Sequence, residues 1–295
     1  MSRLADPKIL MAIKDLPLAA KTTVDGFLAG LHTSKVKGVG MEFSQYRSYQ
    51  AGDDLRRLDW KLFARSDRYY IRESEIETSI SVRIIVDASA SMLHEDSGFT
   101  KIEYARYIAA SLACLARQQG DSIGLYVLQG GKLVTLPSRN DSQHLARIYF
   151  QLEQIKASGF FTEPFQYKDI ISGNSKRELV ILITDYYEKN GEITKLIRSL
   201  SEIKHELIVL HLMGNNELEL DYKGYSALED LETGQVIKVD PEKGKKIYKE
   251  NLDQYLEQIR IELLKRNVFY ERVAMNEPLE LVLTNFLKHR NKRGR

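Results

Sequence analysis

Two apolar segments that each end directly on an aspartate constrain the fold of this chain most. Residues 80–86 precede Asp87, and residues 179–184 precede Asp185. Continuous runs of Ile, Leu and Val are typical of strands buried on both faces, as in parallel sheets covered by helices. We therefore expect two central strands, and if these strands are neighbours, both aspartates lie at the carboxyl edge of the sheet.

The segments around these strands predict a doubly wound α/β domain over residues 80–295. Gly130-Gly131 indicates a tight hairpin, so we expect residues 132–136 to form an antiparallel edge strand. The alternation of apolar and amphipathic segments favours a mostly parallel sheet with crossover helices. The remaining expected strands cover residues 123–128, 207–213 and 268–274, and the expected helices cover residues 101–118, 141–156, 192–203 and 241–265.

Residues 1–79 have a different character. Two short helices, near residues 7–16 and 18–28, precede a polar stretch with glycines and aromatic residues, and residues 68–77 are compatible with a strand. The region has few aliphatic residues for a large core of its own. We therefore expect an accessory region that packs on the sheet domain, with Trp60 buried.

The composition of the chain excludes several kinds of site and disfavours membrane insertion and secretion. The single cysteine, Cys114, excludes an internal disulfide and a cysteine-based zinc site. No apolar run is long enough to cross a membrane, and Asp6 and Pro7 interrupt the place of a secretory signal, so we expect a cytoplasmic protein without membrane insertion.

The formal net charge of +2 comes from the end of the chain. Without the five basic residues of the stretch 288–295, 38 basic residues face 41 acidic ones. The body of the protein is therefore not a basic platform for nucleic acid. The basic tail is either a solvated terminus or an electrostatic contact for nucleic acid or anionic lipid.

The loop after the first apolar segment, Asp87-Ala88-Ser89-Ala90-Ser91, carries three oxygen-bearing side chains at alternate positions. Alternate residues of an extended loop point the same way, so Asp87, Ser89 and Ser91 converge. One carboxylate and two hydroxyls suit Mg²⁺ or Mn²⁺ completed by water, and they leave a position for an anionic oxygen of a partner. The alternative is that these side chains cap the loop and the helix that follows.

Three segments resemble known families. Residues 84–92 (IIVDASASM) resemble the metal-ion-dependent adhesion site of von Willebrand factor A domains, and residues 180–185 (VILITD) resemble their later strand and its aspartate. Residues 52–60 (GDDLRRLDW) resemble the Gly-Asp-Asp-x-Arg-x-x-Asp-Trp signature of a bacterial family catalogued as domain of unknown function 58. The resemblance implies a von Willebrand factor A-like domain, metal-dependent protein binding, frequent association with MoxR-type AAA+ ATPases, and no established enzymatic activity.

Carried over residue by residue, the resemblance implies five metal-site residues. Asp87, Ser89 and Ser91 match the first metal loop, and Asp185 matches the aspartate that usually acts through water. Thr162 is the candidate for the remaining threonine ligand, although two aromatic residues separate it from the glycine that such sites usually place before it. We expect weak Mg²⁺ or Mn²⁺ binding and a partner that presents an acidic side chain.

A cluster of opposite charges around the signature is a second candidate site. It is either a docking or phosphate-binding surface or an ion-pair network that braces the N-terminal region on the sheet domain. Its members are Arg47, Asp53, Asp54, Arg56, Arg57, Asp59 and Arg65.

Enzymatic functions find less support in the sequence. It contains no nucleophile-elbow, phosphate-loop or zinc-protease motif, and its six histidines show no ligand spacing. His211 lies in an apolar strand and is expected to be a core histidine, whereas His94 either overhangs the site or lies in a solvated loop. We expect a non-enzymatic protein-interaction module that works as an adaptor with a MoxR-type ATPase. The alternative is a divalent-metal-dependent hydrolase that uses Asp87.

Overall fold

The computed structural model describes residues 6–33, 45–50, 58, 60–73, 79–162, 170, 177–203, 205–221, 226–239 and 241–293. The chain divides into two compact units, one of Met1–Gly30 with Ile80–Arg295 and the other of Leu31–Ser79. The sequence analysis grouped residues 1–79 as one region. The structure instead assigns the first 30 of them to the sheet unit.

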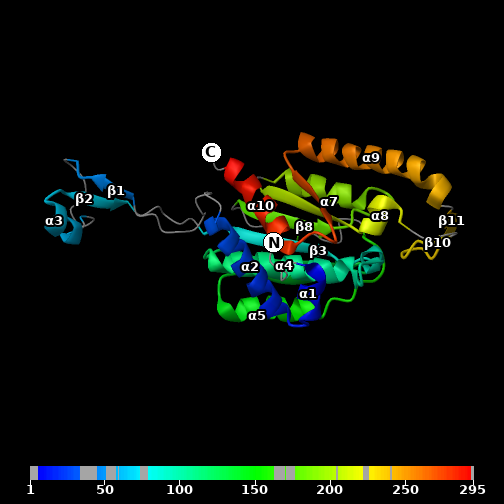
Figure 1. The fold of residues 1–295 in the computed structure, drawn as a ribbon, viewed down its shortest axis with the longest axis horizontal. Helices are drawn as coiled ribbons and strands as arrows, with labels where there is room; N and C mark the ends of the chain where they lie inside the picture. Colours follow the sequence, from blue (N-terminus) through cyan, green and yellow to red (C-terminus); the bar gives the residue numbers. More distant parts are fainter. Residues whose placement is uncertain are drawn as a thin grey trace. The chain divides into compact units, whose positions relative to one another are not determined.

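A six-stranded sheet in the described residues forms the centre of the larger unit, with the strand order β12-β9-β8-β3-β6-β7 (Figure 1). Every neighbouring pair is parallel except β6 and β7, so the antiparallel edge strand predicted after Gly130-Gly131 is confirmed. Both glycines of that hairpin have positive φ, 51° and 76°, which explains why glycine stands there. The strands are β3 (Ser81–Asp87), β6 (Ser122–Gln129), β7 (Lys132–Arg139), β8 (Glu178–Thr184), β9 (Glu206–Met213) and β12 (Phe269–Ala274).

Helices cover both faces of this sheet, as Figure 1 shows for α4 and α5 on one side and α7 and α9 on the other. Consecutive residues Ile84 and Ile85 of β3 are both fully buried, which requires a covered face on each side of the strand. The doubly wound α/β fold predicted from the sequence is therefore confirmed. The helices are α4 (Lys101–Gln118), α5 (Ser142–Glu153), α7 (Glu192–Ser201), α9 (Pro241–Lys265) and α10 (Leu279–Arg293).

Two N-terminal helices, α1 (Pro7–Ala12) and α2 (Leu16–Thr33), complete the larger unit. Leu10 and Phe27 are almost fully buried, and the Tyr107 hydroxyl of α4 donates to the Met11 carbonyl over 3.5 Å. The apolar faces of these helices thus pack on the sheet unit, which is why the chain divides inside the region that was grouped as residues 1–79.

The smaller unit contains an antiparallel pair, β1 (Gln45–Ser48) and β2 (Tyr70–Glu73), and the helix α3 (Trp60–Ser66). The expectation that Trp60 is buried is wrong, because its side chain is 61% exposed. Its ring instead meets the Phe63 ring edge-on, with 6.3 Å between the centroids. Of the charge cluster, only Arg65 has a described side chain, and that side chain is exposed. The other six side chains lie outside the described residues.

The remaining short elements lie in the loops of the larger unit. The sequence analysis did not predict the hairpin of β10 (Ser226–Glu229) and β11 (Val236–Val239). In the described part of the chain, no helix has both the length and the apolarity needed to span a bilayer. The other short elements are η3 (Ala90–Leu93), β4 (Glu95–Asp96), β5 (Phe99–Thr100) and α8 (Asn215–Glu219).

Candidate functional site

The two predicted aspartates meet at the switch point of the sheet. Strands β3 and β8 are parallel neighbours, and the chain leaves β3 toward β6 but leaves β8 toward β9. Doubly wound sheets bind ligands at this point, beyond the carboxyl ends of the strands. Asp87 ends β3 and Asp185 directly follows β8, so the prediction that both lie at this edge is confirmed.

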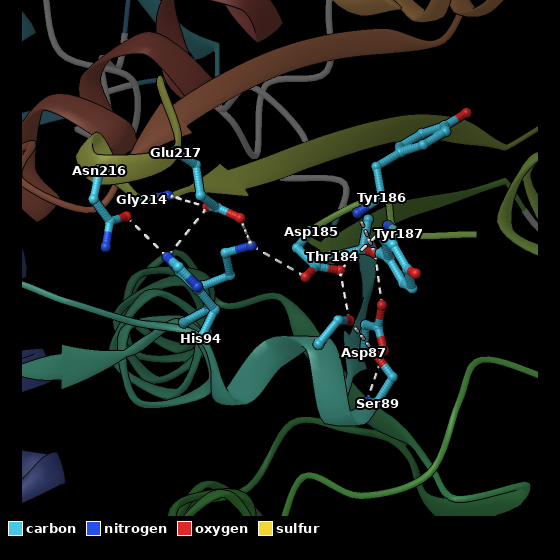
Figure 2. A network of polar contacts seen from close by, with 12 residues as sticks. Asp87, Ser89, His94, Thr184, Asp185, Tyr186, Tyr187, Gly214, Asn216 and Glu217 are labelled. Atoms are coloured by element: carbon cyan, nitrogen blue, oxygen red, sulfur yellow. Dashed lines mark hydrogen bonds and ion pairs between the residues drawn. The ribbon is translucent and has the colours of Figure 1, made fainter. Parts of the chain in front are cut away.

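The Asp-x-Ser-x-Ser loop places its oxygens in a row that reaches Asp185 (Figure 2). The Ser89 amide donates to Asp87 Oδ1 at 2.9 Å, which turns the loop back over the end of β3. The Ser89 and Ser91 hydroxyl oxygens are 3.0 Å apart, and the Ser91 hydroxyl donates to Asp185 Oδ1 at 3.1 Å. The structure thus brings together four of the five residues that the resemblance implied.

Thr184 is a member of the site that the sequence analysis missed. Its hydroxyl donates to Asp87 Oδ2 at 2.7 Å and accepts the Tyr186 amide at 3.0 Å. Tyr186 has a φ of 56°, a left-handed conformation that is unfavourable for a bulky residue, and its side chain is almost fully buried. The only signal in the sequence was a hydroxyl at the end of an apolar strand.

Asp87 has a strongly perturbed environment. Its carboxylate is completely buried, and burial together with the nearby charge of Asp185 raises the pKa of Asp87 to about 6. Hydrogen bonds from Thr184 and Ser89 act in the opposite direction and favour the ionised form. The two carboxylates therefore repel each other at the switch point.

Lys101 supplies a buried positive charge that the sequence analysis also missed. Its ammonium nitrogen lies 3.2 Å from Asp185 Oδ2 and 2.8 Å from Glu217 Oε1, and its side chain is only 5% exposed. Burial opposes the charged form, but the two carboxylates more than offset this and raise the pKa of Lys101. Lys101 is the first residue of α4, a helix whose start is fixed by the reciprocal hydrogen bonds of Thr100 and Glu103.

The turn after β9 closes the other side of the network (Figure 2). Glu217 Oε2 accepts the Gly214 amide at 2.6 Å. His94 Nε2 lies 2.8 Å from Asn216 Oδ1 and 3.8 Å from Glu217 Oε2. His94 thus contacts this turn beside the site and is not a freely solvated loop residue. Its ring is already engaged with Asn216.

Thr162 follows a segment that pairs with the metal loop. The Ser158 amide donates to the Ala88 carbonyl at 2.9 Å, and the Ala90 amide donates to the Gly159 carbonyl at 2.8 Å. Thr162 is half-buried three residues beyond Gly159. Its proposed role as a ligand stays a prediction.

The residues present fit a small divalent ion. Magnesium binds oxygen ligands at about 2.0–2.1 Å in an octahedron, so adjacent ligand oxygens lie roughly 2.9 Å apart. The hydroxyl oxygens of Ser89 and Ser91, two of the candidate direct ligands, are 3.0 Å apart. No three histidine, cysteine, aspartate or glutamate side chains within the described ranges gather as a metal-binding group, so an ion here depends on the serine hydroxyls.

The charge balance of the site also favours a divalent ion. Three carboxylates, those of Asp87, Asp185 and Glu217, face the single ammonium of Lys101. With all of them ionised, an excess of two negative charges remains at the strand ends. A divalent cation would neutralise that excess.

His211 shows how a histidine near this edge can be purely structural. Its side chain is buried, and its Nδ1 lies 2.9 Å from the Tyr270 hydroxyl. Burial lowers the pKa of His211 to about 4, so the ring is neutral at physiological pH. The prediction of a core histidine is confirmed.

The fold and the Asp-x-Ser-x-Ser loop at its switch point define a von Willebrand factor A-like α/β protein. The model of the family described as "Protein of unknown function DUF58" matches residues 45–256. The chain belongs to this family, as the signature at residues 52–60 indicated.

The chain is also similar to individual proteins. It is 27% identical over 243 residues to the uncharacterized proteins Rv1480 of Mycobacterium tuberculosis and Mb1516 of Mycobacterium bovis, covering 80% of this chain and 75% of each relative. Among solved structures, it is similar to the conserved hypothetical protein BatB from Bacteroides thetaiotaomicron, with 20% identity, a TM-score of 0.49, and coverage of 72% of this chain and all of that one. It is also similar to the SpRpn10 VWA domain, with 8% identity, a TM-score of 0.41, and coverage of 70% and 95% of the two chains.

Proposed function

We propose that this protein is a non-enzymatic, metal-dependent protein-interaction module whose binding site is the switch point of its sheet. The observation that carries this proposal is the 3.0 Å spacing of the Ser89 and Ser91 hydroxyl oxygens beside the buried carboxylate of Asp87, with Asp185 hydrogen-bonded to Ser91. Asp87 would be the only carboxylate among these residues in direct contact with the ion, and the hydroxyls are neutral, so the set holds a hard divalent ion weakly and leaves local positive charge for an incoming anionic oxygen.

The ion would be Mg²⁺ or Mn²⁺. Asp87, Ser89 and Ser91 would hold it directly, Asp185 would act through water, and Thr162 is the candidate for a further ligand. When bound, the ion supplies an exchangeable position with positive charge. An acidic side chain of a partner protein has the chemistry to fill that position.

The hydrolase alternative needs a reactive group that this site does not offer. Asp87 is completely buried, and its two oxygens already accept hydrogen bonds from Ser89 and Thr184, so it is poorly placed to attack a substrate. A general base must reach the reacting atom, and the nearby imidazole of His94 is engaged with Asn216. We therefore favour binding without turnover.

The partner and the location rest on the family resemblance. We propose a MoxR-type AAA+ ATPase as the partner, with this chain as its adaptor in the cytoplasm. Binding of a purified ATPase of this type, abolished by a chelator and restored by Mg²⁺, is the expected result of a pull-down. Capture that is equally strong with and without chelator would contradict metal dependence.

Calorimetric titration with Mg²⁺ and Mn²⁺ tests the ion site directly. We expect weak binding by the wild-type protein and none by Asp87→Ala, because that change removes the carboxylate assigned to the ion. Ser91→Ala should weaken binding less, since it removes a neutral hydroxyl. The control Asp253→Ala removes an exposed acid from α9 and should change nothing. Equal affinity in the wild type and Asp87→Ala, with unchanged circular dichroism, would refute the assigned site.

A further inference from the structure

The β10–β11 hairpin ends in a well-ordered turn. The Asp230 amide donates to the Gln235 carbonyl at 2.8 Å, and Asp230 Oδ1 accepts the Glu232 amide at 2.9 Å. Burial disfavours the Asp230 carboxylate, but hydrogen bonds from Thr233 and Tyr187 lower its pKa to about 2. Asp230 therefore organises the turn and fixes the direction in which Glu232 leaves it.

Tyr187 joins this turn to the candidate metal site. Its hydroxyl donates to Asp230 Oδ2 at 2.7 Å, while its own amide donates to Asp185 Oδ1 at 3.3 Å. One residue thus contacts both the turn and an aspartate of the site. The hairpin, which is distant from β8 in sequence, is held beside the end of that strand.

Glu232 is an unusual carboxylate in this position. Its side chain is only 3% exposed, and its Oε1 has no hydrogen-bond partner within the described residues. The other oxygen is 3.8 Å from the ammonium of Lys189, whose side chain is 41% exposed. A buried carboxylate of this kind is costly unless a cation compensates it, and a half-exposed lysine at that distance compensates it only weakly.

The surroundings of Glu232 disfavour its ionised form and so increase the stabilisation that a bound cation would give. Burial raises the pKa of Glu232 to about 7; the charge of Lys189 opposes this, and the negative charges of Asp185 and Asp87 each add a smaller increase. Those two charges are the carboxylates of the candidate metal site, so Glu232 lies within their electrostatic reach. Two other acidic side chains already have partners. Glu217 binds Lys101 and accepts the Gly214 amide, and Glu188 accepts hydrogen bonds from the amide and hydroxyl of Thr194.

We propose that Glu232 is this chain's own acidic ligand for the ion, held by the β10–β11 hairpin at the position that a partner's acidic side chain would fill. The inference rests on the metal site of the proposed function. Among the described residues, Asp87, Asp185 and Glu232 do not gather closely enough to hold an ion together, so the proposal requires Glu232 to move toward the ion when it binds. A partner must then displace Glu232, which lowers the apparent affinity for the partner and favours partners with well-placed acids.

Two measurements on the full chain test this proposal. Calorimetry with Mn²⁺ alone gives the affinity for the ion. Fluorescence anisotropy of labelled hexaglutamate, in saturating Mn²⁺, gives the affinity for an external acid. The variants are Glu232→Gln and the matched control Glu229→Gln, which removes an exposed acid from β10 of the same hairpin.

We expect Glu232→Gln to weaken Mn²⁺ binding about fivefold to tenfold and to strengthen hexaglutamate binding by a similar factor, because an internal competitor is lost. Glu229→Gln should change neither value by more than about twofold, which separates competition from a general loss of negative charge. A purely structural role of Glu232 would not improve capture of the external acid.

Two results would overturn the proposal in distinguishable ways. If Mn²⁺ binds the wild type and Glu232→Gln equally, while Asp87→Ala abolishes binding, the metal site stands and Glu232 is not its ligand. If Mn²⁺ does not bind the wild type at all, the proposed function fails and the inference about Glu232 fails with it.

Discussion

At the scale of single residues, Lys101 determines the electrostatics of the switch point. Its ammonium bridges Asp185, which directly follows β8, and Glu217, which lies in the short helix α8 after the neighbouring strand β9. A buried lysine is costly unless it is paired and hydrogen-bonded, and here both partners are close. Lys101 therefore offsets part of the carboxylate repulsion without an ion, and it contacts Oδ2 of Asp185, whereas Oδ1 accepts hydrogen bonds from the Ser91 hydroxyl and the Tyr187 amide.

Replacing this ammonium tests how much the fold depends on it. We expect Lys101→Met to lower the free energy of unfolding by about 3 kcal/mol in the presence of chelator, because two carboxylates lose their buried partner. Added Mg²⁺ should stabilise the variant more than the wild type, since the ion takes over the neutralising role. Urea denaturation with and without Mg²⁺ measures both effects.

The surface lysine Lys249 provides the control for this experiment. It pairs with the carboxylate of Glu219, but its side chain is 43% exposed. Lys249→Met should leave the free energy of unfolding nearly unchanged, because exposed pairs contribute little. An equal loss in the two lysine variants would show that burial of Lys101 does not matter for stability.

At the scale of secondary-structure elements, α2 packs on the sheet unit, as expected for the N-terminal region, although the sequence analysis grouped it with the rest of residues 1–79. Ala20, Val24 and Phe27 lie on one buried face of this helix, at the three- and four-residue spacing of an amphipathic helix. A Cβ atom at Gly26 would approach within 2.5 Å of the Glu280 carboxylate on α10, so the two helices pass close to each other. The burial of this face explains why α2 belongs to the sheet unit.

A pair of α2 variants tests this packing. Phe27→Ala should destabilise the protein by about 3–4 kcal/mol, because it removes a large buried ring and leaves a cavity. Leu18 lies on the same helix but is 52% exposed. Leu18→Ala should therefore lower the free energy of unfolding by less than about 0.5 kcal/mol. Urea denaturation compares the two, and similar small effects would mean that α2 contributes nothing to the folded core.

At the scale of the whole molecule, the residues Leu31–Ser79 form a separate unit inserted between α2 and β3. The sheet unit contains the buried core and the candidate metal site on its own chain segments. The signature at residues 52–60 falls within the inserted unit. The candidate metal site and the family signature therefore lie in different units.

Excision of the inserted unit should leave the sheet unit folded. Replacing residues 34–76 by a linker of about 20 Gly and Ser residues gives a chain that can span up to about 65 Å. We expect the shortened chain to unfold cooperatively in urea. It should also keep any Mn²⁺ binding that Asp87→Ala abolishes in the full chain. Loss of cooperative unfolding would show that residues 34–76 are needed for the stability of the sheet unit.

Local patterns in the sequence were sufficient to predict the sheet and the Asp-x-Ser-x-Ser loop of the candidate site. Buried strands covered on both faces leave continuous apolar runs, and a tight hairpin needs glycine, so β3, β8 and the edge strand β7 could all be predicted. The spacing of Asp87, Ser89 and Ser91 is encoded within five residues, and their convergence was predicted for an extended loop. The chain instead enters the 3-10 helix η3 at Ala90, and this turn brings the Ser89 and Ser91 hydroxyls to 3.0 Å.

Only the tertiary structure decided which other charges surround that loop. Lys101 meets Asp185 and Glu217 across sequence separations of 84 and 116 residues, and no local pattern marks either contact in advance. Glu232 comes from a hairpin that the sequence did not reveal, and a hydrogen bond from Tyr187 to Asp230 joins this hairpin to the segment after β8. These side chains have ordinary surface-type sequence surroundings, and it is the meeting of strand ends at one edge of the sheet that turns them into a site.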